Sequence, residues 1–313
     1  MKRIKYFSLA ILLVCLLVWI LLPAVVNPAA VPEDREFVIY ASSEPARMMT
    51  EMITHDVPGM SISVLTQPQE NGYEEYSLSD WELALLEDAD VFVMLGNGFE
   101  DFSGTLQSDK TIFISVLGSL KLKSVSDYAC RVLDYTGNEE EADIIPYSYL
   151  SLDGMMNACE ALCANFTVAD EAYASNYLKN LNELYDYIGE LKEASDVEQF
   201  SGNLPVAVAC EASLYLLDDV GIKPDLIIRR NIGQELDEQE MAEICEQLAE
   251  EKIDTLICES QMPESNKKYF ENNGVKLITI DLMLTKTEKT GSDAYGEFYR
   301  RNLNKLTGGM PDE

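Results

Sequence analysis

The sequence predicts an α/β protein of two lobes, each with a mostly parallel β-sheet flanked by helices, joined by one long helix. In both halves of the chain, short apolar runs alternate with helical patterns, which is typical of parallel sheets with right-handed crossovers. Residues 171–194 lack proline, contain glycine only at Gly189 and carry apolar residues at helical spacing. At 1.5 Å per residue this helix would span about 36 Å. A chain of 313 residues is long enough for two cores, which favours two lobes.

The chain begins with a targeting segment. Lys2, Arg3 and Lys5 precede an apolar run over residues 7–26, which is long enough to cross a bilayer. We expect residues 1–30 to be a signal or membrane anchor, with the folded part outside the cytoplasm. The length of the run favours an anchor that is not cleaved, although small residues near its end leave cleavage open.

The first lobe is expected to begin with a buried strand over residues 37–41. Ser42, Ser43 and Pro45 follow as a helix-start signal, because serine caps helices and proline suits their first turn. Ser79 opens a further helix. The other apolar runs expected to form strands of this lobe lie at 60–65, 90–95 and 111–116.

The alternation of strands and helices restarts after the long helix. The expected strands lie at 204–209, 225–228, 255–258 and 276–280, and the expected helices at about 212–220, 238–251 and 265–273. The parts of the chain are then an anchor at 1–30, an N-terminal lobe at 36–165, a connecting long helix at 166–200 and a C-terminal lobe at 201–308.

Composition excludes several functions. The chain has 55 acidic and 23 basic residues, and its net charge of −32 would repel nucleic acid and anionic lipid. His55 is the only histidine, so neither a serine triad nor a histidine-rich metal cage can be assembled, and we expect no enzyme. Cys159 and Cys163 lie one helical turn apart, and we interpret them as part of a buried stripe. Gly96 and Gly98 are interpreted as a strand-to-helix turn.

One long segment and several shorter ones resemble a known family in order and spacing. Residues 76–100 are similar to the first-lobe signature of the metal-specific, TroA-like solute-binding proteins. The shorter similar segments lie at 146–151, 209–216, 256–261 and 279–281. The resemblance, which covers roughly residues 36 to 306, implies two lobes joined by a rigid helix and a cation held between them by two ligands from each lobe. It also implies delivery to an ABC transporter permease, and we expect a monomer.

The resemblance places Tyr147 at the second ligand position, Cys210 at the third and Asp281 at the fourth, where manganese-type members have a carboxylate. Histidines usual in the family are absent. The first ligand falls in a loop of ambiguous register, residues 72–75, where we select Glu74. A thiolate, two carboxylates and a phenol oxygen could hold a divalent ion, and Cys210 favours zinc over manganese. The alternative is that Tyr147 and Cys210 pack as ordinary residues in a cleft that takes another solute.

The leading interpretation is an extracytoplasmic solute-binding protein of an ABC importer, with a zinc-class cation as cargo. One alternative is a surface interaction or adhesion protein on the same scaffold, without a transported metal. Another is a receptor for a metal chelate, for which Arg229 and Arg230 are the clustered candidates, although we expect them to be surface charges. Glu259 is expected to be a buried carboxylate bonded to backbone amides.

Overall fold

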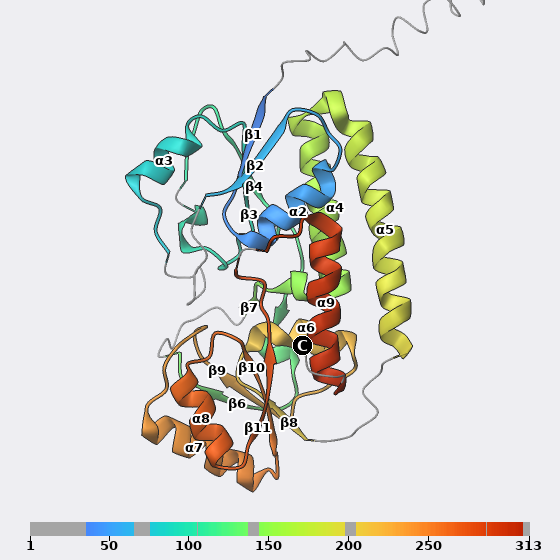
Figure 1. Cartoon of the computed structure of the whole chain (residues 1–313). Helices are drawn as coiled ribbons and strands as arrows, with labels where there is room; N and C mark the ends of the chain where they lie inside the picture. The colour runs from blue at the N-terminus through green and yellow to red at the C-terminus, as the bar shows by residue number, and fades with distance from the viewer. Residues whose placement is uncertain are drawn as a thin grey trace, which may run out of the picture.

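The computed structural model describes residues 36–65, 76–104, 106–136, 144–197, 205–285 and 287–308. Two parallel sheets lie one above the other in Figure 1, and helices flank both of them. The first has the strand order β2-β1-β3-β4 and the second β11-β10-β8-β9-β6. The predicted α/β fold with two mostly parallel sheets is therefore confirmed.

The first sheet is built from short apolar strands. Its central strands β1 and β3 are the most buried, and Ile39 of β1 lies opposite Ile62 of β2 and Val91 of β3. Neighbouring apolar residues on both sides explain why this register is fixed. The strands are β1 (Phe37–Ala41), β2 (Met60–Val64), β3 (Val91–Met94) and β4 (Ile112–Ser115).

Two helices of this part of the molecule begin where the sequence signals them. Ser79 caps its helix through a capping box with Glu82. Ser43 occupies the predicted cap position of α2, but its side chain makes no capping hydrogen bond. The helices are α2 (Glu44–Thr54), α3 (Asp80–Leu86), α4 (Leu152–Ala169), α5 (Ala174–Val197) and α9 (Gly291–Thr307).

The long helix that the sequence predicts is α5, a continuous helix of 24 residues. It begins three residues later than expected, because a 3-10 turn (Glu171–Tyr173) separates it from α4. Tyr177 of α5 donates a hydrogen bond at 2.5 Å to Asp170, the residue between α4 and that turn, which fixes the corner. In Figure 1, α4 and α5 run antiparallel along one side of the molecule, and α9 lies beside them.

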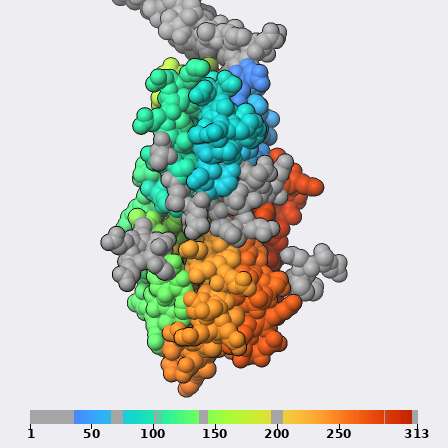
Figure 2. All heavy atoms as spheres, turned by 90° about the vertical axis from the view of Figure 1, so that its left-hand side faces the viewer, coloured from blue at the N-terminus to red at the C-terminus, as the bar shows by residue number. Residues whose placement is uncertain are grey.

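The second sheet includes a strand that precedes the long helix in the chain. β6 (Arg131–Asp134) pairs in parallel with β9. Figure 2 accordingly shows green residues of the first half of the chain beside the orange residues of the second. The lobe boundaries at 165 and 201 stay predictions. The other strands of this sheet are β8 (Val206–Val208), β9 (Leu226–Arg229), β10 (Thr255–Glu259) and β11 (Lys276–Ile280), and the remaining helices are α6 (Leu214–Asp219), α7 (Glu238–Glu250) and α8 (Glu264–Asn272). Two short strands, β5 (Lys123–Ser124) and β7 (Ile144–Ile145), form a separate antiparallel pair.

Buried tyrosines and one acid connect the two lobes. The Tyr149 hydroxyl donates to the Leu282 carbonyl at 3.0 Å, and Asp219 of α6 accepts from the Leu152 amide at 2.7 Å and from the Tyr299 hydroxyl at 3.2 Å. Burial raises the pKa of Asp219 to about 6. These contacts join α6 and the chain after β11 to α4 and its preceding turn.

The predicted anchor, residues 1–30, lies outside the described residues and stays a prediction. Among the helices that the structure does describe, none combines the length and apolar character needed to cross a membrane.

Candidate functional site

The strands of the two sheets end toward each other at the middle of the molecule (Figure 1). Ligand sites of parallel sheets form at the carboxyl ends of strands. In the second sheet those ends carry Cys210 after β8, Arg230 after β9, Glu259 at the end of β10 and Asp281 after β11. Two of the four predicted ligands, Cys210 and Asp281, therefore lie at this edge.

On the first sheet, the turn after β3 is closed by its own carboxylate. Glu100 accepts hydrogen bonds from the Leu95 amide at 3.0 Å, the Gly96 amide at 2.7 Å and the Ser42 hydroxyl. Burial raises the pKa of Glu100. Gly96 has φ +75°, and a Cβ there would lie 2.1 Å from the Ser115 hydroxyl oxygen, so the position requires glycine. These amides are occupied by the protein, which agrees with a structural turn and not a phosphate loop.

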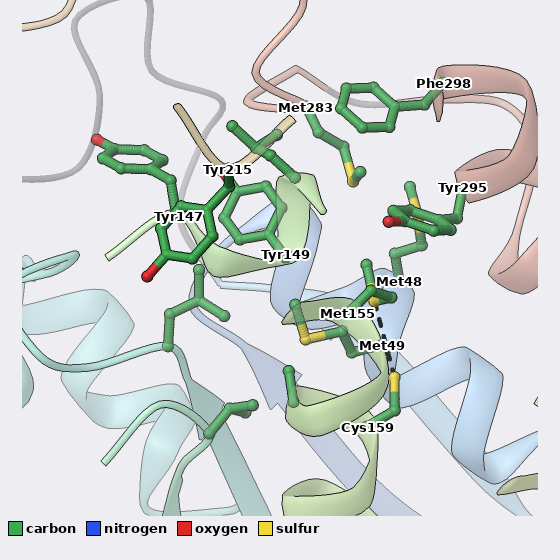
Figure 3. Packing of buried hydrophobic residues seen from close by; sticks show 14 of the residues in the cluster. Met48, Met49, Tyr147, Tyr149, Met155, Cys159, Tyr215, Met283, Tyr295 and Phe298 are labelled. Atoms are coloured by element: carbon green, nitrogen blue, oxygen red, sulfur yellow. Dashed lines mark hydrogen bonds between the residues drawn. The ribbon is translucent and has the colours of Figure 1, made fainter. Parts of the chain in front are cut away.

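Tyr147 lies in an aromatic cluster beside the second lobe. Its side chain is buried, with its ring centroid 5.4 Å from that of Phe99 and 6.2 Å from that of Tyr149. The turn that follows Tyr147, η3 (Ser148–Leu150), contacts η5 (Glu211–Ser213), the turn that follows Cys210. Figure 3 shows Tyr147 and Tyr149 in this packing. With the Tyr149–Leu282 hydrogen bond, the segments that carry three predicted ligands meet.

Cys210 is buried, with 3% of its surface exposed. Burial raises the pKa of its thiol well above the usual value, and the nearby Glu259 carboxylate adds to this effect while Arg230 opposes it. The thiol is therefore protonated at neutral pH in this arrangement. A metal ion would have to displace that proton to use the sulfur as a ligand.

Arg230 is not a surface charge, contrary to the expectation from sequence. Its side chain pairs with Glu259, and the exposed fractions of the two side chains are 1% and 0%. The Glu259 Oε1 atom also accepts from the Gly233 amide at 3.2 Å, so one backbone amide holds this carboxylate as expected. The Arg230 Nε and Glu259 Oε2 atoms are buried without a hydrogen-bond partner among the described residues. A charge can be buried here because its counter-charge is buried with it.

Arg229 is also buried, at 8% exposed, and the expectation of a surface charge is wrong for it too. It donates to Glu211 at 2.7 Å and to Asp134 of β6 at 3.1 Å. This contact links the turn after Cys210 to the strand that joins the second sheet from the first half of the chain.

Asp281 is held by the last helix. Its Oδ1 atom accepts from the Met283 amide at 2.8 Å, and its Oδ2 atom pairs with Arg301 of α9. The Asn302 side chain bonds both backbone groups of Asp281, at 3.0 and 2.9 Å. The carboxylate lines a cavity of about 630 Å³ together with Met48 of α2 and Arg301. The guanidinium of Arg301 therefore already occupies one carboxylate oxygen of Asp281, the predicted fourth ligand.

Glu74, the selected first ligand, lies outside the described residues. Within the described part of the chain, no three histidine, cysteine, aspartate or glutamate side chains are grouped closely enough to hold a metal ion. The four-residue metal site stays a prediction. Sequence reasoning missed the roles of Arg230 and Arg301, and the one available signal was that Arg230 directly follows an apolar strand.

Several solved structures share this fold. The structure of the solute-binding protein FpvC from Pseudomonas aeruginosa in complex with Mn²⁺ has a TM-score of 0.75 and 17% sequence identity, and covers 88% of this chain and 98% of its own. The laminin-binding adhesin Lmb from Streptococcus agalactiae, a mutant structure, has a TM-score of 0.71 and 17% identity, covering 86% and 98%. AdcAII from Streptococcus pneumoniae has a TM-score of 0.71 and 17% identity, covering 88% and 100%. At these identities the likeness shows a common fold.

Comparison with curated proteins finds no match. The family described as "Zinc-uptake complex component A periplasmic", ZnuA, matches residues 39–309 and so spans both lobes and the helix between them. The match includes every strand and helix from α2 to α9. This chain therefore belongs to the ZnuA family and is a solute-binding protein of the metal ABC importer type, not an enzyme.

Proposed function

We propose that this protein is the extracytoplasmic receptor of an ABC importer and that it carries a zinc-class cation between its lobes. The ligands would be Tyr147, Cys210 and Asp281, with Glu74 as the fourth. The observation that supports this proposal is the meeting of three segments at the facing strand ends, where η3 contacts η5 and the Tyr149 hydroxyl bonds the Leu282 carbonyl at 3.0 Å. The permease of the importer is the partner that receives the ion.

The proposed ligands suit a soft to borderline metal ion, but the ion has to compete with protons and with a guanidinium for them. A thiolate and carboxylates are zinc ligands, whereas a phenol must first lose its proton. Here the ion must also displace the proton of Cys210 and the guanidinium of Arg301 from Asp281. We therefore expect zinc to bind more weakly than it would to the same ligands without Arg301.

The test is a zinc titration of the purified protein, with heat release and melting temperature measured together. One zinc ion per chain should bind and raise the melting temperature, because a ligand that binds only the folded state stabilises it. Cys210→Ala should lose most of the affinity. Cys245→Ala, a half-buried cysteine of α7 far along the chain from the predicted ligands, is the matched control and should bind as the parent does. Zinc that leaves the melting temperature unchanged, or an unaffected Cys210→Ala variant, would contradict the proposal.

A second candidate function is a surface interaction or adhesion protein that transports no ion. The observation that favours it is the pair of internal salt bridges, Arg230 with Glu259 and Arg301 with Asp281, which supply fixed cations to the carboxylates at the strand ends. The structural likeness to a laminin-binding adhesin agrees with this reading of the scaffold. Genes for a permease and an ATPase beside this gene would support transport, and their absence together with a flat zinc titration would support the interaction role. Nothing in the described cleft favours a chelate, because Arg229 and Arg230 are both engaged in buried ion pairs.

A further inference from the structure

Sulfur atoms gather where α2 packs against α4, away from the strand ends. The two helices face each other with buried methionines and cysteines. Figure 3 shows Met48, Met49, Met155 and Cys159 together on this side of the core. The Cys159 Sγ atom lies 3.8 Å from Met155 Sδ, one turn earlier on α4, and 4.0 Å from Met52 Sδ on α2. We call Met52, Met155 and Cys159 the sulfur cluster.

We propose that the sulfur cluster is a binding site for a soft monovalent metal ion, copper(I) or silver(I), separate from the cleft between the lobes. Thioether and thiolate ligands select copper(I) over harder ions. Three sulfurs at about 2.3 Å from one ion in a plane would lie about 4.0 Å from each other. The two separations from the Cys159 sulfur, 3.8 and 4.0 Å, are close to that spacing.

The charge of the cluster favours a monovalent ion over zinc. The exposed fractions of Cys159 and Met155 are 0%, and that of Met52 is 4%. A buried net charge is costly in this environment. One thiolate and two neutral thioethers around copper(I) have no net charge, whereas a divalent ion would leave one positive charge uncompensated. On binding, the thiol proton leaves to solvent as the sulfur–metal bond forms, and no electron is transferred. Burial strongly raises the pKa of Cys159, so the ion and not the solvent must drive this ionisation.

A cavity lies beside Met52 and is separated from the other two cluster residues by its side chain. Met52 lines a cavity of about 520 Å³ between α2, α5 and α9. The same cavity is lined by the carboxylate of Asp293, by His55, and by Glu51 and Glu183, which pair with Arg47 and Lys179. Met52 thus has one side at the cavity and its sulfur at the cluster, and a rotation of its flexible side chain would open the path.

The test measures the affinity of the full-length reduced protein for copper(I) in competition with a chromophoric copper(I) chelator, with silver(I) as an air-stable second probe. The discriminating variants are Met52→Leu and Met155→Leu, because leucine keeps the volume and removes the sulfur. Met49→Leu, on the same helix as Met52, is the matched control. Each cluster variant should lower the affinity at least tenfold, and the control should leave it unchanged.

X-ray absorption of the copper(I) protein gives an independent readout. The parent should show three sulfurs at about 2.3 Å, and Met155→Leu should show two. Cys210→Ala, which removes the thiol proposed for the cleft, should not change either result. The proposal would be overturned if the parent protein bound copper(I) no more tightly than Met52→Leu does. It would also be overturned if the absorption spectrum showed mainly nitrogen and oxygen ligands.

Discussion

The buried ion pair of Arg230 and Glu259 makes a sharp prediction about stability. Glu259→Gln removes the negative charge and leaves the guanidinium buried, while its amide oxygen can still accept from the Gly233 amide. Breaking a buried pair at one partner costs about 3–5 kcal/mol. Arg230 keeps two bonds, to the carbonyls of Asn231 at 3.2 Å and Gln234 at 3.1 Å, so we expect a loss near the lower end, about 3 kcal/mol.

The reverse change, Arg230→Met, should cost more, about 4 kcal/mol, because among the described residues Glu259 then keeps only the Gly233 amide as a hydrogen-bond partner. In the double variant no charge is buried, and such replacements are often neutral. The two single losses should therefore not add, and the coupling free energy should be at least about 3 kcal/mol.

Urea unfolding of the four proteins, followed by far-ultraviolet circular dichroism, measures this coupling. Glu183→Gln, which breaks the exposed pair of α5 with Lys179, is the control and should leave the urea midpoint almost unchanged. If Glu259→Gln loses less than about 1 kcal/mol, or if the double variant loses the sum of the two single losses, the reasoning about the buried pair is refuted.

Three further predictions concern the lobe contacts. Arg301→Met should raise the affinity for zinc about fivefold, because it frees Asp281 from a half-exposed ion pair worth about 1 kcal/mol. Calorimetric titration measures the affinity, and an unchanged or lower value would contradict the prediction. Asp219 has a pKa of about 6 in the folded protein, above its usual value, so its protonated form stabilises the fold near pH 4 and this stabilisation is lost as the pH rises through 6. Asp219→Asn should therefore be more stable than the parent above pH 6, by up to about 3 kcal/mol, and equally stable near pH 4. Thermal unfolding at the two pH values measures this difference. Tyr149→Phe should lower the free energy of unfolding by about 1–2 kcal/mol because the buried Leu282 carbonyl loses its donor, and an unchanged urea midpoint would argue against that bond.

Much of the fold was predictable because its central strands are apolar and buried on both faces. β6 was not predicted because it is an edge strand. Arg131 and Val132 are exposed, so no apolar run marks it. α9 was missed as well, although Tyr295 and Phe298 are buried along it. Its glycines argue against a helix in sequence, but a Cβ at Gly296 would lie 1.8 Å from the Tyr187 hydroxyl oxygen, so glycine lets the Tyr187 side chain of α5 pack closely there.

The candidate site was predictable only in part. The resemblance gave the order of the segments carrying Tyr147, Cys210 and Asp281, and the structure brings those segments together. The cations beside them were not predictable from a pattern. Arg301 meets Asp281 across 20 residues of chain, and this partnership depends on the position of a helix whose presence the sequence analysis did not establish.

The crossing of β6 into the second sheet limits how this protein can be divided. A fragment that starts at residue 205 would contain β8 to β11 but not β6, and β9 would then present a bare row of amides and carbonyls along the whole of Leu226–Arg229. Bare edges of this kind recruit other strands and lead to aggregation. The C-terminal half is therefore not expected to fold on its own. Insertions, fusions or truncations that separate residues 131–134 from it should give a misfolded protein that aggregates.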